Sequence, residues 1–147
     1  MEVAKLDSNK IVITTVSIKK HLCQNASGVF EIAATTTNCR ALFGDSNDYV
    51  PNVQPTICKN NPGVGDTWDP ANKIFTEPRA NIGGHASWSI DTNTGIWVAP
   101  EMYTIVDGYG KFTWKEDLQK WQAQKEGEMT TSNWYEWNNS TKAWDAI

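Results

Sequence analysis

The chain has 147 residues, with 13 Lys or Arg against 17 Asp or Glu, and a formal net charge of −4. This length allows one domain with a modest core or two small lobes. The basic residues are scattered and form no stripe, so we expect no nucleic-acid partner. No apolar run is long enough for a membrane span, so we expect no membrane partner. Met1–Lys5 lacks the apolar core of a signal peptide, so we expect synthesis in a cytoplasm.

The N-terminal third of the chain predicts β structure. Met1–Lys5 is expected to form a short arm, and Leu6–Lys10 contains a turn. Ile11–Lys19 is dense in β-branched residues and predicts a strand. After a loop at Gln24–Gly28, the weak alternation of Val29–Thr36 predicts a second strand, antiparallel to the first.

The middle of the chain predicts a junction between two lobes. Cys39–Phe43 is compatible with a short strand or one helical turn, and the residues do not decide between them. Thr56–Cys58 is expected to form a brief strand within a loop-rich segment. All eight tryptophans lie after this segment. We therefore predict an N-terminal β lobe with its arm at residues 1–62 and a Trp-rich tandem β-hairpin lobe at residues 63–147.

A short aromatic pattern occurs four times in the second half. The units are Trp68–Phe75, Ile90–Trp97, Trp114–Trp121 and Trp137–Trp144, and each opens on a large apolar residue and closes on an aromatic seven positions later. A repeat of this kind predicts one supersecondary unit used several times. The polar, turn-forming centre of each unit predicts a β-hairpin whose opening and closing side chains face each other.

The candidate core or interaction residues are the large rings of these hairpins. They are Trp68, Phe75, Trp88, Trp97, Trp114, Trp121, Trp137 and Trp144. A hairpin alone is marginal in water, so these rings must pack on each other, on the N-terminal half or on another protein.

Two segments, one between the units and one within the third unit, do not follow the repeat pattern alone. Tyr103–Val106 is strand-like. Leu118–Glu126 has helix-favouring residues, whereas the repeat favours a hairpin, and we prefer the hairpin because the other three units agree. The predicted fold is all-β, an N-terminal antiparallel sheet followed by tandem Trp-rich β-hairpin repeats.

Part of the second half resembles a known family. Gly65–Phe75, Ser87–Asp91, Ile96–Pro100 and Phe112–Trp114 resemble motifs of small tryptophan-rich, virion-associated proteins of marine tailed phages, of the cyanophage type. The resemblance covers roughly residues 63 to 121. It implies a structural role in the virion and carries no catalytic residues to transfer.

Candidate chemistry in the chain is sparse. His85 follows two glycines, and we favour an ordinary loop histidine over a general base because no Cys or carboxylate stands at a motif spacing from it. Asp45 and Asp48 are better explained by a solvated turn than by a calcium loop.

The three cysteines are an odd number, which argues against a disulfide framework. Cys23, Cys39 and Cys58 could join His21 in a zinc site, but their spacings match no tight ligand pair. Buried, reduced cysteines are preferred. We expect no cofactor and no metal.

The sequence therefore predicts a non-enzymatic structural component of a tailed-phage virion, decorating the capsid or attached to the tail. Its partners would be other virion proteins, with a homo-oligomer left open, and its location would be the virion after synthesis in the host cytoplasm. The alternative is a carbohydrate-binding module for host attachment, because tryptophans left exposed can stack on sugar rings. An enzyme is the least favoured class.

Overall fold

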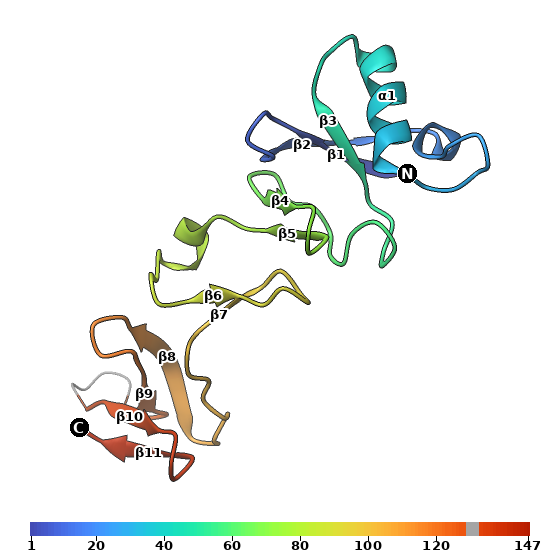
Figure 1. Cartoon of the computed structure of the whole chain (residues 1–147). Helices are drawn as coiled ribbons and strands as arrows, with labels where there is room; N and C mark the ends of the chain where they lie inside the picture. Colours follow the sequence, from blue (N-terminus) through green and yellow to red (C-terminus); the bar gives the residue numbers. More distant parts are fainter. Residues whose placement is uncertain (129–132) are drawn as a thin grey trace. The chain divides into compact units, whose positions relative to one another are not determined.

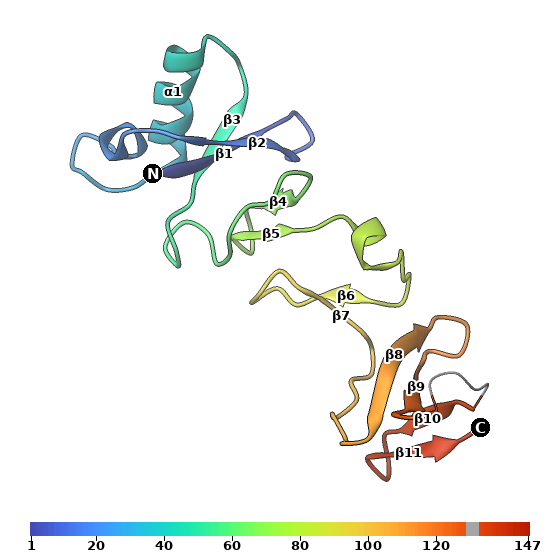
Figure 2. The same cartoon turned by 180° about the vertical axis from the view of Figure 1, so that it is seen from behind.

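The computed structural model describes residues 1–128 and 133–147. Within these ranges the protein is mostly β, with several small antiparallel sheets and one α-helix (Figures 1 and 2). The elements are β1 (Glu2–Leu6), β2 (Val12–Ser17), η1 (Lys20–Cys23), α1 (Ile32–Phe43), β3 (Asp48–Pro51), β4 (Thr67–Asp69), β5 (Ile74–Thr76), η2 (Arg79–Ile82), β6 (Ser89–Ile90), β7 (Trp97–Val98), β8 (Tyr109–Lys115), β9 (Lys120–Lys125), β10 (Tyr135–Asn138) and β11 (Ala143–Ala146). Across the described residues, no helix has the length and apolar character needed to cross a membrane.

The chain divides into two compact units. Unit 1 comprises residues 1–83 and 90–97, and unit 2 comprises residues 84–89 and 98–147. The predicted boundary between residues 62 and 63 does not coincide with this division. The physical reason is that the first hairpin, with Trp68 and Phe75, packs into the core of the N-terminal sheet.

Unit 1 begins with a three-stranded antiparallel sheet in the order β2-β1-β3. The predicted arm at Met1–Lys5 is wrong, because Glu2–Leu6 is the central strand of this sheet. Apolar side chains of this strand are buried on both faces of the sheet. A strand covered on both sides lacks the alternation of apolar and polar residues that marks a strand in a sequence, so an arm was predicted instead. The predicted strand at Ile11–Lys19 is confirmed as β2.

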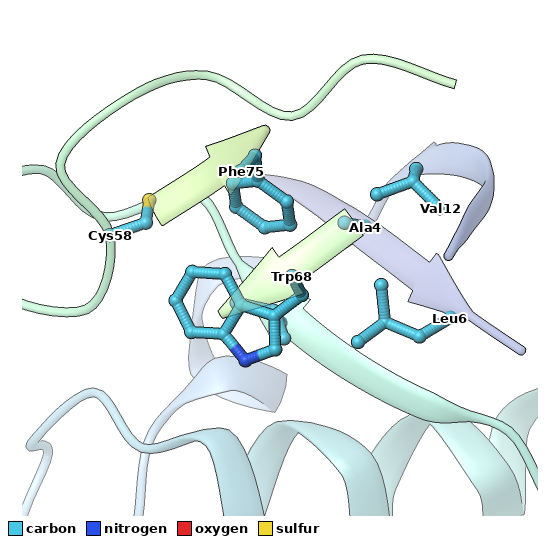
Figure 3. Close-up of a cluster of buried hydrophobic side chains, with 7 residues drawn as sticks. Ala4, Leu6, Val12, Cys58, Trp68 and Phe75 are labelled. Atoms are coloured by element: carbon cyan, nitrogen blue, oxygen red, sulfur yellow. The ribbon is translucent and has the colours of Figure 1, made fainter. Parts of the chain in front are cut away.

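Each face of this sheet has its own core. Val3 and Tyr49 pack with the buried cysteines Cys23 and Cys39 on one face. The second cluster consists of Ala4, Leu6, Val12, Val50, Cys58, Trp68 and Phe75. Figure 3 shows the rings from β4 and β5 gathered with Leu6 and Val12 of the sheet.

The predicted second strand at Val29–Thr36 is wrong, because Ile32–Phe43 forms α1. Thr35, one of the threonines that suggested a strand, bonds within the helix: its Oγ1 donates to Glu31 O at 2.7 Å. Thr35 and Cys39, four residues apart, are buried on one face of the helix. Gly44 ends the helix at φ 68°, where its N–H donates to Arg40 O. Cys39–Phe43, left open above, is the last part of α1.

Two shorter strand predictions are also wrong. Thr56–Cys58 lies in a turn, where Ile57 N donates to Val53 O at 2.8 Å. Tyr103–Val106 has no regular secondary structure, and the Tyr103 ring stacks on Phe112 at 4.6 Å between centroids. Ring packing, and not a hydrogen-bonded ladder, fixes that segment.

The strands of the predicted hairpins pair as antiparallel sheets. β4 pairs with β5, β6 with β7, and unit 2 contains a four-stranded sheet in the order β11-β10-β9-β8. The cross-strand partners include Trp68 with Phe75, Trp114 with Trp121 and Trp137 with Trp144. The segment from Trp114 onward is thus a hairpin, as preferred, and not a helix.

The four turns share one backbone feature. The residue two positions before each closing aromatic has a positive φ: Lys73 at 58°, Gly95 at 78°, Gln119 at 49° and Lys142 at 55°. In three of the turns the residue after the opening position is Asp or Asn, and its side chain accepts main-chain bonds from the turn. Such bonds favour the tight reversal of the chain.

Candidate functional site

The structure places the eight predicted ring residues in several clusters and not in one site. Five are buried, namely Trp68, Phe75, Trp114, Trp137 and Trp144, and Trp88, Trp97 and Trp121 are half-buried. Buried indole and phenyl rings contribute area to a core and leave little face for a ligand. Among the eight predicted rings, the half-buried ones are therefore the candidates for contact with a ligand.

In unit 2, rings from several segments form one continuous aromatic core. Trp144 contacts Trp137 at 5.2 Å between centroids, and Tyr103 contacts both Phe112 and Trp121. Edge and tilted arrangements predominate, which is the preferred geometry of aromatic pairs. The indole N–H of Trp121 donates to Glu101 O at 2.8 Å and fixes the orientation of that ring.

Glu116 in the β8–β9 turn collects polar groups of unit 2. Its carboxylate accepts bonds from Ser87 N at 2.6 Å, Ser87 Oγ at 2.8 Å and Trp114 Nε1 at 2.8 Å. His85 Nδ1 lies 3.8 Å from the same carboxylate, and its ring lies 5.1 Å from that of Trp88. Sequence reasoning missed Glu116, because a carboxylate in a polar turn is usually solvated.

This cluster has the geometry of a structural bond network. Partial burial raises the pKa of Glu116, but the bonds from Trp114 and Ser87 lower it more, so the pKa lies below its ordinary value. The Ser87 hydroxyl donates to Glu116 instead of to His85. The bonds from the Ser87 N–H and hydroxyl tie Ser87 to the β8–β9 turn of unit 2.

Trp97 lines a small recess in unit 1. The recess has a volume of about 360 Å³ and is lined by Thr67, Asp69, Thr76, Glu77, Pro78, Arg79, Ile90 and Trp97. The Arg79 guanidinium carbon lies 4.4 Å from the Trp97 ring centroid, and the indole N–H donates to Glu77 O at 2.9 Å. An aromatic face beside fixed polar groups is the chemistry of a small-molecule site.

A larger recess lies beside the N-terminal sheet. Its volume is about 650 Å³ and its lining is Ser17, Ile18, Lys19, His21, Leu22, Leu42 and Phe43. Leu42 is 57% exposed and Phe43 is 45% exposed, although both stand at the end of a helix with a packed face. Sequence reasoning missed this recess, since α1 was not predicted.

Within the described part of the chain, the candidate metal ligands do not come together as one site. Cys23, Cys39 and Cys58 are free and buried, as preferred above, and no group of three metal-binding side chains occurs in the ranges described. Burial raises the pKa of Cys39 to about 11, so this thiol is protonated at neutral pH. His21 lines the larger recess instead of joining the cysteines.

The acidic turn at Asp45 and Asp48 is held by protein groups. Asp45 accepts from Tyr49 Oη at 2.7 Å and lies 2.7 Å from Lys5 Nζ, and Asp48 pairs with Arg40. The bonds from Lys5 and Tyr49 hold the pKa of Asp45 below its ordinary value. These carboxylates therefore connect the turn to Lys5 of β1 and to Arg40 of α1.

Comparison of this chain with protein-family models, with curated proteins and with solved structures gave no match.

Proposed function

We propose that this chain is a non-enzymatic structural component of a tailed-phage virion, on the capsid or on the tail, that acts through contacts with other virion proteins. The virion assignment is supported by the resemblance over residues 63 to 121. The contact role is supported by large apolar side chains that stay exposed, Leu42 and Phe43 among them. We further infer that the four hairpins are tandem copies of one repeat.

The observation that carries this proposal is the shared construction of the hairpins. The opening and closing side chains are cross-strand partners in the three hairpins with a defined register. A residue with positive φ stands two positions before the closing ring in all four. Reuse of one supersecondary unit is the construction of repeat proteins, which commonly act as binding scaffolds. That organisation favours assembly over catalysis.

Quantitative mass spectrometry of purified virions tests the assignment. The chain should be present, and its copy number relative to the major capsid protein should separate the two placements. Hundreds of copies would indicate capsid decoration, and a few to tens would indicate a tail component. Absence from purified virions whose other structural proteins are detected would refute the proposal.

Glycan binding during host attachment is the second candidate function, and the recess at Trp97 favours it. Its volume of about 360 Å³ suits a saccharide unit, and it combines an indole ring with carboxylates and hydroxyls. Titration of the full chain with methyl glucoside, galactoside and mannoside, followed by saturation-transfer NMR, tests this function. A saturable signal that is lost in Trp97→Leu and kept in Trp88→Leu would favour it over the structural role.

A further inference from the structure

The outer edge of β2 is open along its second half. Met1 and Ile18 exchange both main-chain bonds, Met1 N to Ile18 O and Ile18 N to Met1 O, each at 2.9 Å. Alternation along an antiparallel pair then directs the N–H and C=O groups of Thr15 and Ser17 away from β1. β2 is an edge strand in the sheet order, so these groups face no strand of this sheet.

The other parts of the sheet edge are covered. At β3, the Tyr49 N–H donates to Thr36 Oγ1 at 2.9 Å and the Thr36 hydroxyl donates to Tyr49 O at 3.1 Å. At the start of β2, Val12 N donates to Asp66 O and Gly65 N donates to Val12 O, each at 2.8 Å. Native sheets usually protect their edges. The opening at Thr15–Ser17 is therefore a local exception.

The larger recess continues from this opening. Ser17, the last residue of β2, and Ile18 line the recess, which is completed by the apolar side chains of Leu22, Leu42 and Phe43. An extended segment that pairs with β2 would place alternate side chains on each face of the sheet. The side chains on one face would then have an apolar surface to cover.

Lys19 carries the formal charge among the residues that line the recess. The residues of β2 are uncharged, the recess is lined by Lys19 and His21, and no residue that lines it is acidic. A second copy of β2 would bring no acidic side chain to this edge, because the residues Val12–Ser17 are all uncharged. Opposite charges on neighbouring strands stabilise a pair, so a segment with carboxylates complements Lys19 and a second copy of β2 does not.

We propose that the open edge of β2 and the adjoining recess bind an extended segment of a neighbouring protein that alternates apolar and acidic residues. The main chain of the segment bonds to Thr15 and Ser17, its apolar side chains cover Leu42 and Phe43, and its carboxylates lie near Lys19. This mode is strand addition, in which main-chain bonds supply affinity and side-chain pockets supply specificity. It rests on the contact function proposed above and names the chemistry of the partner.

The test uses the full chain and a fluorescein-labelled eight-residue peptide of alternating Asp and Leu, followed by fluorescence anisotropy. We expect saturable binding with a Kd of about 10–100 µM. Binding should weaken at least about tenfold for the peptide with Lys in place of Asp, since the charge then repels Lys19. Lys19→Glu should reverse the preference between the two peptides, and Lys19→Gln should remove it.

The main-chain part of the proposal has its own matched pair of variants. Thr15→Pro removes the outward N–H and should abolish binding, whereas Thr15→Val keeps that donor and should bind like the parent. Where Thr15→Pro fails to fold by circular dichroism, the parent chain with an Asp–Leu peptide N-methylated at alternate residues replaces it, and binding should again be lost.

Three results would overturn the proposal: no saturable binding up to about 1 mM peptide, equal binding of the Asp and Lys peptides, or unchanged binding by Thr15→Pro. Concentration-dependent dimerisation in analytical ultracentrifugation that Thr15→Pro abolishes would also overturn it, because a second copy would then occupy the edge. The outcome is separate from the virion assignment. Peptide binding can fail while the chain is found in virions. Peptide binding can also succeed while the chain is absent from virions.

Discussion

Gly95 is the position where a single methyl group should most disturb unit 1. A Cβ at this residue would lie 2.6 Å from the main-chain oxygen of Phe75 and 2.7 Å from Asn60 Nδ2. Asn60 itself bonds both the N–H and the C=O of Phe75, at 2.8 and 2.6 Å. The obstruction therefore includes fixed backbone and an amide held on both sides. Neither can move without breaking bonds that hold the first hairpin.

Two terms set the size of the effect of Gly95→Ala. The left-handed φ of 78° costs an alanine about 1–2 kcal/mol, of which the loss of unfolded-state freedom returns about 0.4–1 kcal/mol. The close contacts add roughly 1–3 kcal/mol, as overpacking does elsewhere. We expect a decrease of about 1–4.5 kcal/mol in the free energy of unfolding of unit 1.

Gly28→Ala is the matched control, because Gly28 has nearly the same φ, 77°, with no atom within 4 Å of the added Cβ. It should cost only about 0–1.5 kcal/mol. Urea unfolding gives both values, and hydrogen exchange at the Phe75 amide identifies which unit is affected. Equal destabilisation by the two variants would refute the argument, since only the backbone strain would then matter.

Three other changes have defined outcomes. Gln119→Gly should raise the stability of unit 2 by about 0.5–1 kcal/mol in urea unfolding, because it relieves a non-glycine residue at φ 49°; a loss would contradict this. Glu116 has a pKa below its ordinary 4.5, so its contribution is present above that pH and is lost as the pH falls through the lowered pKa. Glu116→Gln should therefore flatten the acid limb of the stability profile, and an unchanged limb would count against the network. The three buried thiols should resist Ellman's reagent in the native chain and react after unfolding, and rapid native labelling would exclude this burial.

The sequence predicted best what is determined locally. The β2 strand follows from its β-branched residues. The partners Trp114 and Trp121 follow from an aromatic spacing of seven around a polar turn. These features depend on a few neighbouring residues and need no knowledge of the rest of the fold.

The failures concern segments whose partners are distant. β1 has few strand signals of its own and is buried because β2 and β3 flank it. α1 was obscured by three threonines, although the spacing of Thr35 and Cys39 and the stop at Gly44 were present in the sequence. Glu116 belongs to the same class, because its bonds come from Ser87, 29 residues away.

The hairpins also explain why the opening and closing residues stay seven positions apart although the turn sequences differ. In the β4–β5 turn, Asp69 pairs with Ile74 and four residues lie between them; in the β10–β11 turn, Asn138 pairs with Ala143 across four residues. A loop of fixed length sets the register, and a shift of one residue would turn every side chain to the opposite face. The left-handed position closes this loop even where the residue is Lys or Gln, at a cost in backbone energy. The aromatic partners on the adjoining strands offset that cost, so ring pair and strained turn depend on each other.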